Sequence, residues 1–198
     1  MIAGLLLAGG ASRRFGSNKL VAPLGDRPVV RWSAEALAAA VDVVYVVVPA
    51  RADAVRAALD GIAVRWVRNR HSHEGLASSI RTGVSALPAE VDAVVITLAD
   101  QPLVGARSIR QVVERWRVAS AGTRAVVTEY RDGRGHPALF GASVFPALCA
   151  LEGDRGAREL LAALGDAVAV VGVDHERPAD VDTAEALARL NETLATRG

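Results

Sequence analysis

The sequence predicts an α/β protein, a three-layer α/β/α sandwich built around a mostly parallel sheet. Continuous apolar runs rich in β-branched residues recur along the chain, as strands buried on both faces require. Helix-periodic stretches separate these runs and give crossovers of the length that parallel strands need. No linker, repeat or low-complexity stretch interrupts this alternation, so we expect one domain over residues 1–198.

The predicted strands are the apolar runs. The second contains an uninterrupted Val-Val-Tyr-Val-Val-Val, and the third reads Val-Asp-Ala-Val-Val-Ile-Thr-Leu-Ala. The five predicted strands are Ile2–Ala8, Val41–Pro49, Val91–Ala99, Arg124–Tyr130 and Ala167–Val173.

The predicted helices lie between and after the strands. The first is Ala-rich and opens on Pro28, which suits a first helical turn. The last opens on Thr183, a good N-cap, with Glu185 in the first turn. The six predicted helices are Pro28–Ala40, Arg51–Leu59, Ser78–Leu87, Ser108–Ala119, Gly156–Leu164 and Thr183–Leu194.

Bulk composition excludes several classes of protein. Apolar residues make up 51% and charged residues 23%, which is a globular composition, and the length suffices for a substantial core. The net charge of +1 gives no overall field for nucleic acid or membrane. A single cysteine, Cys149, excludes an internal disulfide framework and fits a reducing compartment. With no signal-peptide pattern and no apolar run of membrane-spanning length, we expect a cytoplasmic protein.

The loop after the first predicted strand has the composition of a phosphate site. Its Lys19 is the only lysine in the chain, whereas the other 22 basic side chains are arginines. Adjacent glycines let backbone N–H groups approach a phosphate chain, and Arg14 and Lys19 can neutralise its oxygens. A plain turn with solvated arginines is the alternative, and the lone lysine favours phosphate. The spacing matches neither a G-x-G-x-x-G fingerprint nor a Walker loop.

Two acidic loops predict a metal site. Asp100 ends the third predicted strand, where ligands of parallel sheets bind, and Mg²⁺ at phosphate sites takes one or two carboxylates. Pro102 favours a metal ligand there over a helix cap. Asp180 and Asp182 lie two residues apart near the C-terminus, and one of them can join Asp100 on the metal. The alternative is that Asp182 or Thr183 caps the last helix.

Three further segments carry candidate polar residues. His136, held between Gly135 and Pro137, either contacts an acceptor substrate or packs a turn. The hydroxyls and N–H groups of Gly75–Ser79 either read a base or cap the following helix. His71 and His73 have no accompanying cysteine, so we expect surface residues rather than a zinc site.

These motifs together resemble the molybdenum-cofactor nucleotidylyltransferases, the MobA-like branch of the Rossmann-like nucleotide-diphospho-sugar transferase fold. The family opening L-A-G/A-G-x-S-x-R-x-G-x-x-K is matched throughout from Leu7 to Lys19. Four later motifs follow in the family's order and extend the resemblance over essentially the whole chain. They are D-Q-P at Asp100–Pro102, G-H-P at Gly135–Pro137, G-D-x-G-A-R at Gly153–Arg158 and D-V-D-T-x-E at Asp180–Glu185.

The resemblance implies transfer of a nucleoside monophosphate from an NTP to a phosphorylated acceptor, in that family molybdopterin, with release of pyrophosphate. It implies Arg14, Lys19 and Asp100 as catalytic residues, Asp100 and Asp182 as Mg²⁺ ligands, and Gln101 and His136 on the acceptor side. The implied nucleotide-binding residues are Leu7, Ala8, Gly9, Gly10, Ser12, Arg13, Arg14, Lys19, Gly75, Ser78 and Ser79. The implied partners are the NTP, a pterin-type acceptor and a molybdoenzyme or its chaperone.

The resemblance leaves the base and the activity open. Gly9 is the guanylyl-type residue at its position, whereas Gly75–Ser79 and Gly135–Pro137 match the cytidylyl subgroup, so we favour CTP with GTP as the alternative. Two other functions compete with nucleotidyl transfer. One is an NAD(P)H-dependent oxidoreductase of the same fold, against which the failed dinucleotide fingerprint argues. The other is a non-catalytic accessory protein that delivers a pterin cofactor to a hydroxylase.

Overall fold

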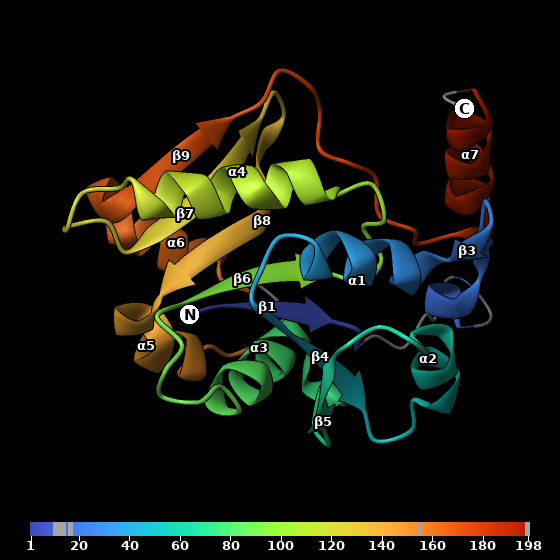
Figure 1. The fold of residues 1–198 in the computed structure, drawn as a ribbon, viewed down its shortest axis with the longest axis horizontal. Helices are drawn as coiled ribbons and strands as arrows, with labels where there is room; N and C mark the ends of the chain where they lie inside the picture. Colours follow the sequence, from blue (N-terminus) through green and yellow to red (C-terminus); the bar gives the residue numbers. More distant parts are fainter. Residues whose placement is uncertain (10–14, 16–17, 154–155, 197–198) are drawn as a thin grey trace.

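The computed structural model describes residues 1–9, 15, 18–153 and 156–196, and these build a seven-stranded sheet (Figure 1). Its strand order is β5-β4-β1-β6-β8-β7-β9, and β8 alone among these strands runs antiparallel to its neighbours. The mostly parallel sheet is thereby confirmed. The strands are β1 (Ile2–Leu7), β4 (Val43–Pro49), β5 (Arg65–Asn69), β6 (Ala93–Leu98), β7 (Ala125–Tyr130), β8 (Gly133–Gly141) and β9 (Val168–Gly172).

All five predicted strands are present, and the structure adds β5 and β8 to them. Strand β5 lies at the sheet edge and carries Arg65 and Arg68 among its five residues, so it lacks a continuous apolar run. Strand β8 begins with Gly133–Pro137, which reads as a turn in the sequence but pairs in part with β7. Only its second half has the apolar pattern of a buried strand.

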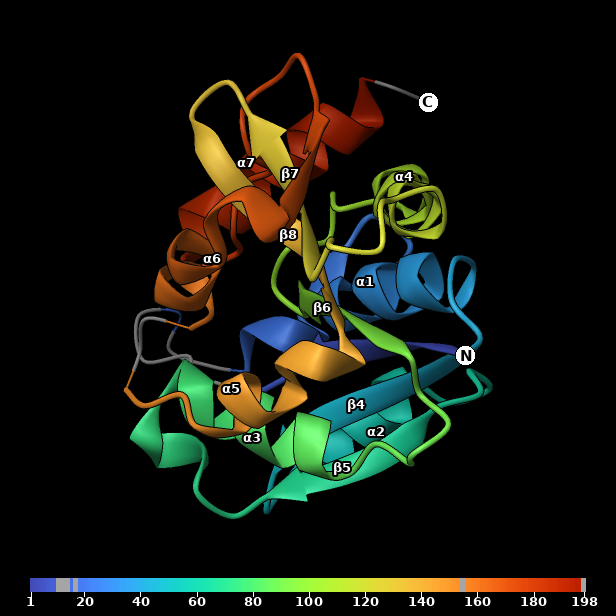
Figure 2. The same cartoon turned by 90° about the vertical axis from the view of Figure 1, so that its left-hand side faces the viewer.

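Helices cover both faces of the sheet, which confirms the three layers. Figure 2 shows α1 and α4 on one side and α3, α5 and α6 on the other. All six predicted helices are present, and α5 is additional. The helices are α1 (Val29–Ala38), α2 (Asp53–Ala58), α3 (Leu76–Ser85), α4 (Ala106–Arg117), α5 (Phe145–Cys149), α6 (Arg158–Leu164) and α7 (Ala184–Ala195).

Each face of the sheet has its own apolar core. Alternate side chains of the strands pack on α1, α2 and α4 on one face and on α3, α5 and α6 on the other. Gly83 of α3 allows close packing on the second face, since a Cβ there would lie 2.5 Å from Leu5 Cδ1 and 2.9 Å from Val47 Cγ2. The core thus fixes α3 tightly against β1 and β4.

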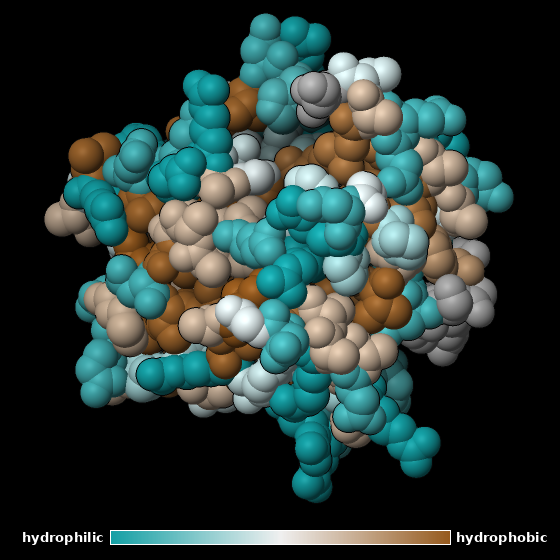
Figure 3. Space-filling view, turned by 45° about the vertical axis from the view of Figure 1, so that its right-hand side comes forward, coloured by the Kyte–Doolittle hydropathy of each residue, from teal (hydrophilic) through white to brown (hydrophobic). Residues whose placement is uncertain are grey.

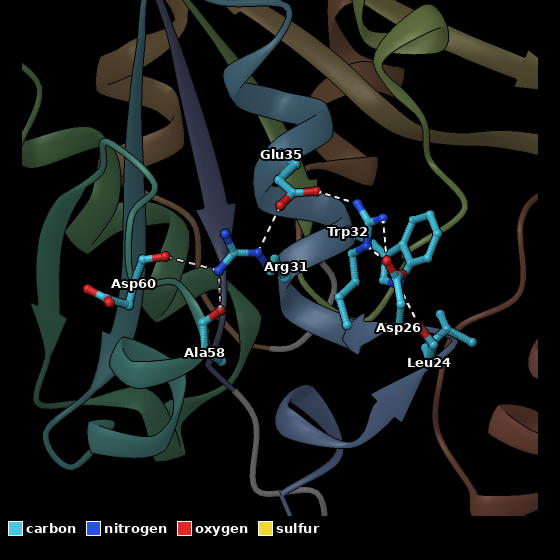
Figure 4. A network of polar contacts seen from close by, with 8 residues as sticks. Leu24, Asp26, Arg31, Trp32, Glu35, Ala58 and Asp60 are labelled. Atoms are coloured by element: carbon cyan, nitrogen blue, oxygen red, sulfur yellow. Dashed lines mark hydrogen bonds and ion pairs between the residues drawn. The ribbon is translucent and has the colours of Figure 1, made fainter.

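A polar network anchors the segment that leads from Lys19 into α1 (Figure 4). This segment contains a 3₁₀ turn at Lys19–Val21 and a two-stranded hairpin of β2 (Pro23–Leu24) and β3 (Arg27–Pro28). The indole of Trp32 donates to Leu24 O at 2.9 Å, and Arg27 contacts Glu35 at 2.7 Å. Arg31 also binds Glu35, at 2.8 Å, and its guanidinium donates to the carbonyls of Ala58 and Asp60 near the end of α2.

The C-terminal part of the chain returns to the carboxyl ends of the strands before it forms α7. The N–H of Val181 donates to Asp100 O at 2.8 Å, which ties this segment to the end of β6. Val181 is fully buried in a third apolar cluster with Leu24, Val29 and Leu190. Burial of Val181 therefore holds the neighbouring acidic residues at the sheet edge.

The surface view in Figure 3 shows hydrophilic and hydrophobic residues interspersed on the side of the molecule that it presents. Within the described parts of the chain, only Met1 and Val118 are large apolar residues that are exposed. No described helix is long and apolar enough to cross a membrane.

Candidate functional site

The carboxyl ends of β1 and β6 lie side by side because these two strands pair in parallel from Ile2 with Ala93 to Leu7 with Leu98. The N–H of Ala99 donates to Leu7 O at 3.1 Å. On the other side, the N–H of Ala8 donates to the carbonyl of β4 residue Val47 at 2.9 Å. Strands β4 and β6 flank β1 on its two sides, so the strand order reverses at β1. Open parallel sheets bind ligands at the carboxyl end of the strands at such a point.

Lys19 lies at the centre of this edge, between two carboxylates. Its Nζ is 2.6 Å from Asp100 Oδ2 and 2.8 Å from Asp182 Oδ1. The Lys19 side chain is only 11% exposed, whereas those of Asp100 and Asp182 are 22% and 37% exposed, so water screens the three charges only in part. Asn18 holds the backbone here, because its side chain accepts from the N–H of Leu20 at the start of the 3₁₀ turn. The structure therefore brings together the predicted ammonium and both predicted metal ligands.

The two aspartates meet through backbone contacts of the C-terminal segment. The N–H of Val181 donates to the carbonyl of Asp100, in the loop after β6. This bond places Asp182, the next residue, beside that loop. The N-cap of α7 is Thr183, whose hydroxyl accepts from the N–H of Ala186 at 3.2 Å. Thr183 therefore takes the capping role, and Asp182 turns toward Lys19.

The pKa of Lys19 reflects both burial and its two partners. Burial alone lowers this pKa, but the charges and hydrogen bonds of Asp100 and Asp182 outweigh burial and raise it above its usual value of 10.5. Lys19 is therefore an ammonium throughout the neutral range.

The convergence of Asp100 and Asp182 on one cation suits a divalent metal. The ammonium stands in for such a cation, since both carboxylates already lie within contact distance of the same nitrogen. Among the residues that the structure describes, no group of three or more His, Cys, Asp and Glu side chains could hold a metal ion. Two carboxylates fit a magnesium-type ion that takes its other ligands from phosphate oxygens and water.

A buried polar cluster lies beside Gly9. Asn69 of β5 donates to Ser78 Oγ at 2.8 Å and to Ser79 Oγ at 3.2 Å, and Ser78 Oγ donates to the carbonyl of His71. The serine hydroxyls thus face β5, and the N-cap of α3 is Gly75, which has a φ of 96° and makes no side-chain cap. The capping alternative for these hydroxyls is not what the structure shows. A Cβ on Gly9 would lie 3.0 Å from Ser79 Oγ, so the two predicted nucleotide segments are in contact.

A cavity of about 410 Å³ lies on the face of the sheet that α3 and α6 cover. Gln101 and His136, the two predicted acceptor-side residues, both line it. The half-buried His136 has Nδ1 3.2 Å from the carbonyl oxygen of Ile96. Since a carbonyl only accepts, Nδ1 carries the proton and Nε2 is left as an acceptor. Burial lowers the pKa of His136 below its usual value, which keeps the imidazole neutral.

Gln101 links the cavity to the acidic loop. Its amide Nε2 donates to Asp180 Oδ1 at 2.7 Å, and Asp180 also lines the cavity. Burial raises the pKa of Asp180 above its usual value, although the bond from Gln101 opposes this. The cavity therefore begins directly beside the residues that flank Asp100 and Asp182.

The predicted residues Gly10, Ser12, Arg13 and Arg14 lie outside the described residues. His71 and His73 are exposed, as predicted. Sequence reasoning missed Asn69, because β5 was not recognised, although an Asn that ends a strand is a signal to look for. It assigned no role to the three arginines that line the cavity: Arg158 was noted only as the end of the G-D-x-G-A-R motif, and Arg134 and Arg177 could not be distinguished among 22 arginines.

A family model and several known proteins match this chain. The family model of the MobA-like NTP transferase domain matches residues 4–169. A molybdenum cofactor guanylyltransferase from Rhodobacter capsulatus is 33% identical over 98% of this chain and 96% of its own. The purine catabolism protein PucB of Bacillus subtilis is 31% identical over 92% of each chain. A probable molybdenum cofactor guanylyltransferase of Haloferax mediterranei is 42% identical, over about half of each chain.

Solved structures show the same fold. Rv0371c from Mycobacterium tuberculosis superposes with a TM-score of 0.83 at 33% identity, covering 96% of this chain and 97% of that one. A second structure of Rv0371c, described as a complex with manganese, gives a TM-score of 0.79 at 31% identity and covers 97% and 98% of the two chains.

Proposed function

Because this chain belongs to the MobA-like NTP transferase family, we propose that it transfers a nucleoside monophosphate from an NTP to a phosphorylated acceptor and releases pyrophosphate. The observation that carries the proposal is the convergence of Lys19, Asp100 and Asp182 at the carboxyl ends of β1 and β6. An ammonium between two carboxylates beside a glycine-rich loop is suited to a triphosphate and its cation.

The proposed reaction needs little proton chemistry. An oxygen of the acceptor phosphate bonds to the α-phosphorus of the NTP, the bond from that phosphorus to the bridging oxygen breaks, and pyrophosphate leaves. A phosphomonoester has a second pKa of about 6 and is already largely dianionic near neutrality. Catalysis then consists of positioning and charge neutralisation, which is what these residues offer.

Each residue has a defined place in this proposal. Lys19 and Arg14 bind phosphate oxygens, while Asp100 and Asp182 would hold Mg²⁺, which supplies positive charge to the phosphates when bound. Gly9, Ser78 and Ser79 lie on the nucleotide side. The contact between Gly9 and Ser79 supports that grouping. The remaining nucleotide-side residues of the proposal are Leu7, Ala8, Gly10, Ser12, Arg13 and Gly75.

The acceptor we propose is molybdopterin or a related pterin phosphate, in the cavity lined by Gln101 and His136. The names of two relatives, both molybdenum cofactor guanylyltransferases, support a molybdenum-cofactor acceptor. A molybdoenzyme or its chaperone would then receive the product. For the base, the motifs at Gly75–Ser79 and Gly135–Pro137 favour CTP, whereas Gly9 and the relatives' names are in line with GTP.

The test is a pyrophosphate-release screen of the four NTPs with Mg²⁺ against phosphorylated acceptors, including molybdopterin. We expect release with CTP or GTP only when a phosphorylated acceptor is present, and loss of release when a chelator removes the metal. Absence of pyrophosphate with every acceptor would refute the proposal.

The Gly9–Ser79 contact gives a test of base choice. Gly9→Ala puts a methyl group 3.0 Å from Ser79 Oγ, closer than ordinary packing, so Ser79 must shift. We expect Gly9→Ala to change the ratio of kcat/KM for CTP to that for GTP, and Ser79→Ala to weaken this effect in the double mutant. Additive effects in the four-member cycle would show that the contact has no part in base selection.

The second candidate function is delivery of a pterin cofactor to another enzyme. The match to PucB over 92% of each chain supports it, because that relative is named for purine catabolism rather than for transfer. A protein of this kind would bind the pterin cofactor tightly and release no pyrophosphate. The oxidoreductase alternative requires NADPH oxidation that is independent of Mg²⁺. The same screen, run with NADPH as a further substrate, separates all three functions.

A further inference from the structure

The cavity beside Gln101 has apolar walls and a basic rim. Strands β6, β7 and β8 supply Ile96, Val127 and Phe140, while α3 and α6 supply Leu76 and Leu161. A body rich in hydroxyl groups, such as a sugar, would leave those groups unpaired against these walls. The cavity therefore suits a body with a flat or apolar part, whose polar contacts are limited to Gln101, His136, Asp180 and three arginines.

Three arginines from three separate segments line this cavity: Arg134 of β8, Arg158 of α6 and Arg177 before α7. Two of them already have carboxylate partners. Arg177 Nε lies 2.9 Å from Asp132 Oδ2, and Arg134 Nε lies 3.8 Å from Glu129 Oε1. Arg158 has no ion pair or side-chain hydrogen bond within the described ranges, so its whole guanidinium is available, whereas the Nε of Arg177 is hydrogen-bonded and that of Arg134 faces a carboxylate.

The backbone that carries Arg158 is fixed against α3. The carbonyl of Gly153 accepts from the N–H of Ala77 at 3.1 Å. Gly156 has a φ of 58°, and a Cβ there would lie 3.0 Å from Leu76 Cδ2, so glycine permits this close approach. Arg158 follows directly as the first residue of α6. Its position beside the cavity is thus set by the contacts of Gly153 and Gly156 with α3, which the proposed function does not explain.

We infer that Arg158 binds the phosphate of the acceptor and thereby selects for phosphorylated acceptors. This inference rests on the proposed function. A guanidinium offers parallel N–H donors that match two phosphate oxygens, and a dianionic phosphate at an apolar cavity needs such a partner. Arg177 is held by Asp132, and the charge of Arg134 is partly neutralised by Glu129. Arg158 is accordingly a specificity-determining residue, separate from Lys19, Asp100 and Asp182.

The experiment measures acceptor binding without nucleotide, by quenching of pterin fluorescence. The probes are 6-hydroxymethylpterin monophosphate and unphosphorylated 6-hydroxymethylpterin. For Arg158→Ala we expect at least a tenfold rise in Kd for the phosphorylated probe and no change for the other. Arg158→Lys should recover only part of the loss, because an ammonium lacks the paired donors. Arg107→Ala is the matched control, an exposed arginine near the start of α4 on the opposite face of the sheet, and should bind both probes like the parent protein.

The outcomes separate this inference from the function it rests on. Equal losses for both probes would mean that Arg158 contacts the ring rather than the phosphate, and an unchanged Kd would mean no contact; either overturns the inference. If pyrophosphate release identifies a different phosphorylated acceptor, Arg158→Ala should raise KM for that acceptor at least tenfold and leave KM for the NTP unchanged. Arg158-dependent phosphate binding without any pyrophosphate release would refute the transferase proposal and leave the inference standing.

Discussion

The sequence alone indicates a phosphate-binding role for Lys19, whereas its two carboxylate partners are known only from the fold. Its uniqueness among 23 basic residues and its place after a glycine-rich loop point to a phosphate site. The two carboxylates around it come from positions 81 and 163 residues further along the chain, a pairing that no local pattern encodes. The residue types of the proposed site could therefore be chosen from the sequence, while the contacts among them depend on the folded sheet.

Removal of the ammonium tests its role directly. We expect Lys19→Ala to lose at least about 2.7 kcal/mol of transition-state stabilisation, roughly a hundredfold in kcat, by analogy with the loss of one preorganised donor. Lys19→Arg keeps the charge but puts a wide planar group between two close carboxylates, so it should not restore the rate. Steady-state kinetics of pyrophosphate release measure both variants, and a parental rate in Lys19→Ala would contradict the assignment.

His136 makes the stability of the protein sensitive to acid. Burial lowers its pKa in the folded state below 6.5, so the unfolded chain takes up a proton first as the pH falls. The stability contribution is present above about pH 6.5 and is lost progressively below it. Urea denaturation at several pH values should show the free energy of unfolding decreasing from pH 7.5 to pH 5.

The matched variant for this pH dependence is His136→Gln, which keeps a polar side chain but cannot titrate. Its free energy of unfolding should decline less over the same interval. Identical pH profiles for the two proteins would show that other groups cause the acid sensitivity.

At the scale of elements, hydrophobic periodicity identified the strands and helices that bury an uninterrupted apolar face. It missed β8, because the first five residues, Gly133–Pro137, have turn composition and gain their strand geometry from pairing with β7. It missed β5 for a different reason: β5 is an edge strand that carries two arginines, so it has no continuous apolar run. Tertiary pairing overrides local preference in both strands.

The contact of α3 with the sheet depends on Gly83. Alanine there gains about 1 kcal/mol in helix propensity, but its methyl group would meet the buried Leu5 and the stiff Val47 at 2.5 and 2.9 Å. Overpacking costs about 1–3 kcal/mol and outweighs the gain, so Gly83→Ala should lower the free energy of unfolding. Gly122→Ala, at an exposed glycine with no atom within 4 Å of its would-be Cβ, should change it by less than about 0.5 kcal/mol.

At the scale of the whole molecule, the fold class and the edge that carries the site followed from the sequence, because ligands of parallel sheets collect at the carboxyl ends of strands. The cavity did not, since it is made by residues from β6, β7, β8, α3 and α6 that no motif links. The family match ends at residue 169, yet Asp180 and Asp182 lie beyond it and Val181 joins them to Asp100. The proposed site thus extends past the residues that the family model matches.

The ammonium that bridges Asp100 and Asp182 neutralises both carboxylates, and it would compete with the divalent cation that we propose for this site. Without nucleotide, a divalent cation would have to displace the Lys19 ammonium from both carboxylates. A bound triphosphate would instead pair with Lys19 through its own oxygens and leave the two carboxylates available to the cation. Electron paramagnetic resonance of free Mn²⁺ should therefore show weak uptake by the protein alone and at least tenfold tighter uptake once CTP or GTP is added. Lys19→Met should take up Mn²⁺ tightly without nucleotide, Lys19→Arg should not, and equal uptake by all three proteins would mean that metal and lysine do not compete.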